Sequence, residues 1–450
     1  MATYYVRSTD GNNADSGSTW ALAKADLHTT AWAAGDKIYV SAAHAQSTAT
    51  AITIAAAGTV ASPTQIICGD DAAEPPTSES TAGTVTTTST NAMTISGSCF
   101  VSGLTFSCGT GGTAVSITQG GTGARQHYKD CYFRLVNSGS TARILVSGGG
   151  EESFTVWENC SVRFASSGQS IGTGNLAAMF YWRGGSLLSG GTSPSTLITP
   201  APSTAKGGII EVSGVDLSNA GTGLNLIASS AAGAWKVLFR NCKLPSGWNG
   251  GLFSGALTEN TIRGEMHNCD AGDTNYRFWI EDQFGTIKQS TSVYRDGGAT
   301  DGTTSISWAM ATTANAEYPL CVLESQELPA IWNSSTGSSK TATVHIVHDG
   351  ASALNDDEIW LEVQYLGTSG FPLSAFVSDR KGLLASASAQ ASSSATWTGD
   401  SGTGPNGSST WNTLKLECTF TPQEAGYIQA KVCMAKASTT VYVDPLMTVA

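Results

Sequence analysis

The feature that most constrains the fold is a cysteine that follows an asparagine or aspartate and recurs at nearly regular intervals. Cys131 and Cys160 are 29 residues apart, and Cys242 and Cys269 are 27 apart. Weaker copies fill the gap between these pairs and extend the series backwards by one step. The seven equivalent positions are Leu104, Cys131, Cys160, Ser186, Val215, Cys242 and Cys269. A period of this length, sustained over so many units, predicts a solenoid.

Each repeat contains short β-like runs separated by Gly, Ser and Asn, without helical periodicity. Leucine-rich repeats fit poorly because no Leu-x-x-Leu-x-Leu frame recurs, and WD-type propeller blades need about 40 residues each. We therefore expect an all-β chain built on a right-handed parallel β-helix, whose strands stack about 4.8 Å apart. The recurring cysteine then forms an inward column, and the Asn or Asp before it makes the tight turn between two sheets.

The chain contains 10 cysteines, and we expect them to be reduced residues of the core. Stacked side chains with parallel Cα–Cβ bonds fit disulfide geometry poorly. No Cys-x-x-Cys pair occurs, so the cysteines do not indicate a metal site. The sequence predicts neither a metal nor a cofactor.

Charge and hydropathy restrict the partners of the protein. Only 13% of the 450 residues are charged, and 35 Asp and Glu against 23 Lys and Arg give a net charge of −12. This balance argues against nucleic acid and against acidic membrane surfaces as partners. The sequence has no apolar run of transmembrane length, and residues 1–7 lack the features of a signal peptide, so we expect neither element.

The repeat is lost beyond residue 300, where longer alternating runs such as Thr341–Val347 and Ile359–Tyr365 begin. Strict alternation with Gly, Ser and Thr-rich connections predicts an antiparallel β-sandwich of the immunoglobulin-like or jelly-roll kind. The expected domains are an N-terminal cap and first turn at 1–60, the β-helix at 61–300 and the sandwich at 301–450.

The N-terminal region adds a resemblance to a known superfamily. Its order is Tyr4-Tyr5-Val6-Arg7, Asp10-Gly11, Trp20-Ala21, a helical stretch to about Ala34, and then Gly35-Asp36-Lys37-Ile38-Tyr39-Val40. This order resembles the cap and first turn of the pectate-lyase-like β-helix proteins. The resemblance implies a capping helix over the open end of the solenoid, with Ser18 or Thr19 as its N-cap.

The layout of cap, β-helix and terminal sandwich is similar to virion proteins of tailed bacteriophages, namely head decoration proteins, head spikes and tailspikes. The resemblance implies a homotrimer on the virion surface, assembled in the host cytoplasm beside the major capsid protein or other virion proteins. We expect a non-enzymatic capsid decoration protein. The alternative is a tailspike or tail fibre protein that binds or depolymerises host surface polysaccharide, and a third possibility is an adhesin that binds cell-surface glycan without turnover.

Carboxylate pairs decide between these functions, because glycoside hydrolysis needs two carboxyl groups at a set separation. Glu211 and Asp216 lie in one repeat, Asp270 and Asp273 in another, and Glu281 and Asp282 follow. We find no column of acids at one position of the repeat, so solvated turn carboxylates are the favoured interpretation. Glu211, Asp216, Asp270 and Asp273 are kept as candidate catalytic residues of the alternative function.

Overall fold

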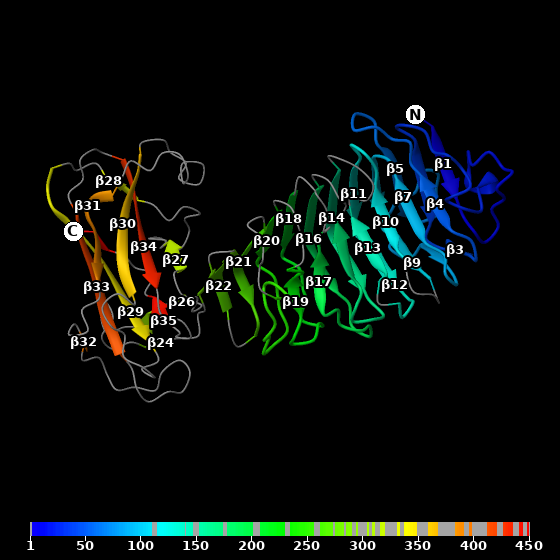
Figure 1. Ribbon diagram of the computed structural model, residues 1–450. Coiled ribbons are helices and arrows are strands. Elements are labelled where there is room, and N and C mark those ends of the chain that lie inside the picture. The colour runs from blue at the N-terminus through cyan, green and yellow to red at the C-terminus, as the bar shows by residue number, and fades with distance from the viewer. Residues whose placement is uncertain are drawn as a thin grey trace. The chain divides into compact units, whose positions relative to one another are not determined.

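The computed structural model describes residues 2–109, 115–139, 141–146, 153–173, 178–200, 208–229, 235–255 and 262–272, and beyond residue 274 the strands β22 to β36 with residues 337–339. The chain divides into two compact units, Met1–Asp273 and Thr274–Ala450. The described residues are almost all in strands or connecting turns and include no α-helix (Figure 1).

The first unit is a parallel β-solenoid in which each turn, here called a rung, lays its strands beside those of the previous rung (Figure 1). Three stacks of strands result. Stack 1 consists of β1 (Thr3–Val6), β2 (Lys37–Ser41), β5 (Thr64–Gly69), β8 (Cys99–Ser102), β11 (Arg125–Lys129), the first halves of β14 (Phe154–Arg163) and β16 (Ala178–Leu187), β18 (Gly208–Ser213), β20 (Trp235–Arg240) and β21 (Ile262–Asp270).

The other two stacks complete each rung. Stack 2 consists of β3 (Ala45–Thr48), β6 (Thr84–Thr87), β9 (Thr105–Cys108), β12 (Tyr132–Leu135) and the second halves of β14 and β16. Stack 3 consists of β4 (Ile52–Ala55), β7 (Met93–Ser96), β10 (Ile117–Gly120), β13 (Arg143–Val146), β15 (Ser170–Thr173), β17 (Thr196–Thr199) and β19 (Asn225–Ile227).

Alternating side chains of these strands point inward and form the core. In stack 3 the register places β-branched residues over one another, as in the row Ile117, Ile144, Ile171 and Ile198, which are fully buried. Aromatic rings fill the space between stacks 1 and 2. Their centroids are 5.7 Å apart for Phe106 and Phe133, 4.7 Å for Phe133 and Trp157, and 5.5 Å for Trp157 and Trp182. The core is therefore a set of stacked side-chain columns.

The turn between stacks 1 and 2 depends on residues that tolerate a left-handed backbone. Asn and Asp take φ values of 49–52° at this position in four rungs, and glycine takes it in three others. The left-handed residues in register are Gly103, Asp130, Asn159, Gly184, Gly214, Asn241 and Asn268. The side chain that follows each of them turns inward, so the position before the recurring cysteine does make the turn.

Six of the seven predicted ladder positions lie in one inward column, and their exposed fractions do not exceed 2%. Ser186 is the exception, because Cys160 pairs with Gly185 and Ser186 pairs with Ser161. Two consecutive glycines take the turn and the inward position in this rung, which shifts the predicted register by one residue. The described cysteines are all free and buried. Burial raises the pKa of Cys99 to about 12, so that thiol stays protonated.

The prediction of an N-terminal capping helix is wrong. Only a 3₁₀ turn, η1 (Trp20–Leu22), is formed there, although Thr19 does accept a hydrogen bond from the Leu22 amide at 3.2 Å. The reason is that the backbone of this segment bonds to β1 instead: the Tyr5 amide donates to Gly17 and the Lys24 amide donates to Tyr5. The segment thus covers the open edge of the first strand with an extended chain, and these tertiary bonds outweigh helix propensity.

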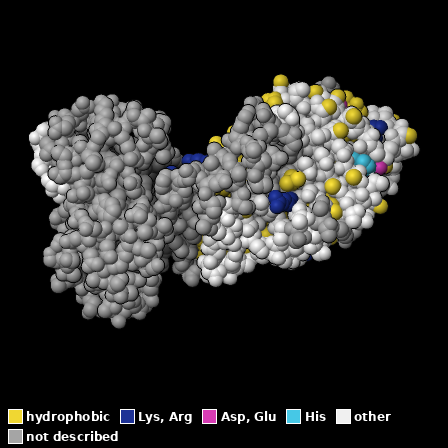
Figure 2. Space-filling model, in the orientation of Figure 1, with side chains coloured by type: hydrophobic (Ala, Val, Ile, Leu, Met, Phe, Trp, Pro, Cys, Tyr) yellow, Lys and Arg dark blue, Asp and Glu magenta, His cyan; other side chains and the backbone are white. Residues whose placement is uncertain are grey.

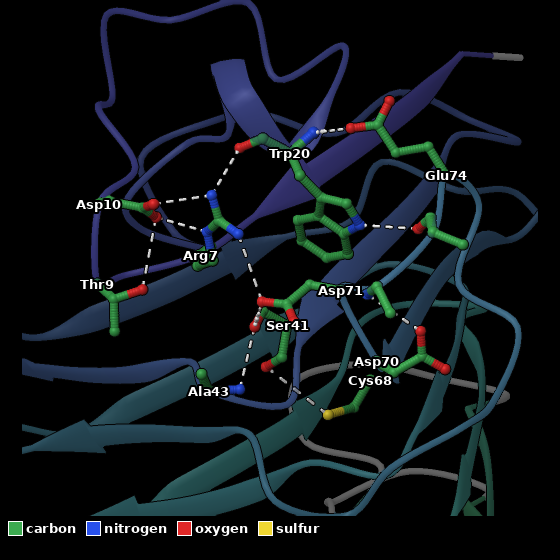
Figure 3. A network of polar contacts seen from close by, with 12 residues as sticks. Arg7, Thr9, Asp10, Trp20, Ser41, Ala43, Cys68, Asp70, Asp71 and Glu74 are labelled. Carbon is green, nitrogen blue, oxygen red and sulfur yellow. Dashed lines mark hydrogen bonds and ion pairs between the residues drawn. The ribbon is translucent and has the colours of Figure 1, made fainter.

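A polar network fixes this covering segment (Figure 3). Arg7 pairs with Asp10 and Asp71 and donates to the Trp20 carbonyl at 3.1 Å. The Trp20 indole donates to the Ala73 carbonyl at 2.9 Å, and its ring lies against Tyr5 with centroids 4.8 Å apart. The outward side of the first rungs is therefore closed by the protein itself.

The second unit contains antiparallel strands, and the predicted alternating runs fall within β29 (Lys340–His348), β30 (Ile359–Gly367), β33 (Asn412–Phe420) and β34 (Gly426–Met434). The shorter strands are β22 (Asn275–Asp282), β23 (Gly285–Gln289), β24 (Tyr294–Arg295), β25 (Thr304–Ser305), β26 (Trp308–Met310), β27 (Ala316–Pro319), β28 (Ile331–Asn333), β31 (Leu383–Gln390), β32 (Thr396–Trp397), β35 (Val441–Val443) and β36 (Thr448–Val449).

Antiparallel pairing begins at β22, within the range 61–300 assigned to the β-helix. The sandwich, the handedness of the solenoid and the domain limits stay predictions. No helix among the described residues has the length and hydropathy to cross a membrane.

The close approach of two rungs at Gly185 predicts a difference between two Gly→Ala variants. Gly185 has a φ of +88°, and a Cβ there would lie 1.9 Å from the Cys160 carbonyl oxygen, whereas Gly123 has a φ of +65° with no atom within 4 Å of such a Cβ. Both variants bear the left-handed penalty of about 1–2 kcal/mol. Only Gly185→Ala also forces two rungs apart, so its unfolding temperature should fall well below that of Gly123→Ala in thermal denaturation. Equal losses would contradict a fixed rung spacing.

Candidate functional site

The candidate site lies on the outward side of stack 1, beyond the first rungs that the segment around η1 covers. We call the outward-pointing residues of β8, β11, β14, β16, β18, β20 and β21 the outer face. Its central column is Phe100, His127, Val156, Tyr181, Glu211, Leu238 and Glu265. One flanking column is Phe154, Met179, Ile209, Lys236 and Arg263, and the other is Lys129, Glu158, Arg183, Ser213, Arg240 and His267.

The half of the outer face nearer the N-terminus is aromatic. The rings of Phe100 and His127 lie edge to face with centroids 5.2 Å apart, and those of Phe154 and Tyr181 are 5.3 Å apart. The Arg183 guanidinium lies 5.2 Å from the Tyr181 ring centre. These rings are only half-buried, so their free surfaces can pack against the apolar faces of a ligand while neighbouring polar groups bond to it.

The other half of the outer face is charged, with Glu265 at its centre. One Glu265 oxygen, Oε1, lies 2.9 Å from Arg263 Nε and 3.7 Å from Lys236 Nζ, and His267 Nε2 donates to Oε2 at 3.2 Å. Burial alone raises the pKa of Glu265, but the hydrogen bond from His267 and the charges of Arg263 and Lys236 outweigh it and lower the pKa to about 2. Glu265 is therefore ionised throughout the physiological range.

Glu211 shares the central column with Glu265, two rungs away, with Leu238 between them. Two steps of about 4.8 Å put the Cα atoms of the two glutamates about 10 Å apart. The Glu211 side chain is half-buried, and no described residue makes an ion pair or a hydrogen bond with its carboxyl group. The pair thus combines one carboxylate that is ionised at neutral pH with one carboxyl group that no described residue binds.

The remaining candidates lie elsewhere. Asp216 and Asp270 share a turn column on either side of Lys243, and each caps its own turn, with Asp216 accepting from the Ser218 amide and Asp270 from that of Gly272. Partial burial raises the pKa of Asp216, but the hydrogen bonds from Ser218 and the charge of Lys243 lower it overall. Both act as turn carboxylates. Asp273 lies outside the described residues, and Glu281 and Asp282 lie in β22, whose side chains are not described.

Glu265 is not among the residues predicted from the sequence, although the sequence contains a signal for it. Glu211 precedes the ladder position Val215 by four residues, and Glu265 precedes Cys269 by the same number. The same offset from a repeating inward position places both on one column of the outer face. Two acids therefore occupy one position of the repeat, with Leu238 between them.

Charged side chains are otherwise sparse on the first unit. Figure 2 shows one side of it, on which uncharged polar and hydrophobic side chains prevail over isolated charged ones. Against that background, the cluster around Glu265 concentrates charge in adjacent rungs.

Comparisons with known proteins find a structural similarity to a phage protein. No protein-family model and no curated protein matches the sequence. Among solved structures, a similar one is the enzymatically active domain of tailspike protein 4 from bacteriophage CBA120. The identity is 10% and the TM-score is 0.22, with 92% of this chain and 64% of the tailspike domain covered, so the chain spans less than two thirds of that domain.

This chain is similar to a phage tailspike. That tailspike structure is described as an enzymatically active domain, against the expectation of a non-enzymatic protein. The structure itself removes the ground for that expectation, because Glu211 and Glu265 do share a column. Capsid decoration gains no support from the comparisons.

The charge cluster predicts how stability depends on pH. The pKa of Glu265 falls from 4.5 to about 2 on folding, so its stabilisation is complete above pH 4.5 and is lost as the pH falls towards 2. A shift of this size corresponds to about 3 kcal/mol. Glu265→Gln should lower the free energy of unfolding at pH 7 by about that amount, and the difference from wild type should vanish near pH 2.

Denaturant unfolding of both proteins between pH 2 and pH 7 measures this difference. Glu158→Gln is the matched control, because Glu158 is half-exposed and, among the described residues, its ion pair is with His127 on the same face. A Glu265→Gln variant as stable as wild type at pH 7 would show that the cluster contributes nothing.

Proposed function

We propose that this protein is a tailspike-type depolymerase that binds host surface polysaccharide along the outer face and hydrolyses it. The observation that carries the proposal is the pair of glutamates in one outward column, Glu211 and Glu265. Inverting glycosidases hold their two carboxyl groups roughly 6.5–9.5 Å apart to leave room for a water molecule. Cα atoms about 10 Å apart are compatible with carboxyl groups at this separation.

The environment of Glu265 assigns the roles within the pair. Glu265 is held ionised by Arg263, Lys236 and His267, so it cannot donate a proton at neutral pH and instead orients the attacking water and accepts its proton. Glu211 donates a proton to the glycosidic oxygen as the bond to the leaving sugar breaks. A carboxylate with so low a pKa is a weak base, so we expect the enzyme to turn over slowly.

The aromatic half of the outer face supports the same function. Tyr181 lies directly beside Glu211 in the central column, and its ring supplies an apolar platform one rung from the proton donor. A sugar chain laid along the solenoid axis contacts ring faces and then the glutamate pair in successive rungs. The same proposal includes a homotrimer on the virion surface, a right-handed β-helix and a C-terminal β-sandwich.

The test is the release of reducing ends from purified host surface polysaccharide by the full-length protein. Glu211→Gln keeps the size of the side chain but removes the proton donor, so turnover should fall at least roughly 100-fold. Asp216→Asn is the control, since it makes the same change at a turn carboxylate of the neighbouring stack, and it should retain wild-type turnover.

Two outcomes would contradict hydrolysis by this pair. Unchanged turnover in Glu211→Gln would exclude Glu211 as the acid. Saturable binding of the polysaccharide by wild type without any release of reducing ends would identify a glycan-binding protein instead.

A further inference from the structure

We infer that the glycan bound on the outer face is anionic, and that Lys236 and Arg263 contact its carboxylate or phosphate groups. This inference rests on the proposed function, because it names the substrate class of the same face. It starts from the register of β20 and β21, which places Lys236 and Arg263 side by side in one flanking column.

Both cations retain hydrogen-bond donors after binding Glu265. Arg263 uses Nε for Glu265, and its terminal Nη groups make no hydrogen bond with any described residue. Lys236 Nζ lies 3.7 Å from Glu265 Oε1, which is an ion-pair distance but too long for a hydrogen bond. A guanidinium group is shaped for bidentate contact with a carboxylate or a phosphate, and a neighbouring ammonium group adds a second point of attachment.

The exposure of these groups shows where the positive charge is directed. The side chain of Glu265 is 9% exposed, whereas that of Arg263 is 33% exposed and that of Lys236 is 47% exposed. The Glu265 carboxylate compensates one of the two positive charges of Lys236 and Arg263. The other positive charge of these two side chains faces solvent. Glu265 acts as an anchor that holds both cations in place before a ligand arrives, which reduces the entropy lost on binding.

The rest of the outer face favours a sugar polymer over other anions. Basic residues are gathered on β16, β20 and β21, although acidic residues outnumber basic ones in the whole chain, 35 to 23. Along the same columns, Ile209 and Tyr181 continue the face with apolar surface one and two rungs from Lys236. A ligand that alternates apolar ring faces with charged groups matches this order of side chains.

The experiment is affinity electrophoresis of the full chain carrying Glu211→Gln, so that turnover cannot alter the gel. Native gels contain polygalacturonate, a phosphodiester-linked teichoic acid, neutral dextran or double-stranded DNA. We expect retardation by polygalacturonate or teichoic acid, which distinguishes a carboxylate ligand from a phosphate one, and none by dextran. The retardation should weaken as ionic strength rises from about 0.01 M to 0.15 M.

The residue test adds Lys236→Gln, which should weaken binding roughly tenfold, as expected for the loss of one charge-assisted contact of about 1.4 kcal/mol. Lys243→Gln is the matched control, because it removes the same charge from an exposed turn position beside Asp216, outside the outer face. Equal weakening in both variants would indicate a general charge effect and would overturn the inference.

The remaining outcomes separate this inference from the proposed function. Retardation by every polyanion including DNA, or by dextran as strongly as by polygalacturonate, would overturn the anionic glycan. Hydrolysis of a neutral polysaccharide by wild type, without retardation by either anionic polymer, would overturn it while the proposed function stands. Specific retardation without hydrolysis by wild type would support the anionic ligand while hydrolysis fails.

Discussion

The first unit depends on one interaction, the in-register backbone hydrogen bonding between parallel strands of successive rungs. Because each residue lies over its equivalent in the rung before, any side chain chosen at one position becomes part of a column. The same constraint builds the isoleucine row of stack 3, the aromatic interior and the outer face. The in-register stacking requires that the chain turns at the equivalent residue of each rung. The left-handed positions at these turns are therefore filled by Gly, Asn or Asp.

Much of this architecture could be predicted from the sequence, because a repeating position leaves a periodic signal. The spacing of Cys131, Cys160, Cys242 and Cys269 was enough to predict the solenoid and its turn residues. Three features lay beyond that signal. The segment around Trp20 has a helix-forming composition but bonds to β1, Gly185 displaces Ser186 by one residue, and the shared column of Glu211 and Glu265 shows in the sequence only as an equal offset from the ladder.

The outer face shows how a solenoid can accommodate an ionised group that its own backbone does not stabilise. Burying the Glu265 carboxylate is costly unless opposite charges accompany it. Arg263, Lys236 and His267 provide that compensation from the same rung and the one before. The arrangement has two effects, since the acid is fixed in its ionised form and long flexible cations are restrained in one place. Charge stabilisation and the proposed ligand recognition are thereby linked through one carboxylate.

The uniform rise from rung to rung also makes the first unit a molecular ruler. Inserting or deleting one complete rung between β16 and β21 would move the aromatic half relative to the charged half by about 4.8 Å without altering either. Chains of this architecture can therefore change the repeat length of the polymer they recognise in whole steps. Such a change needs no new side-chain chemistry, only a different number of turns.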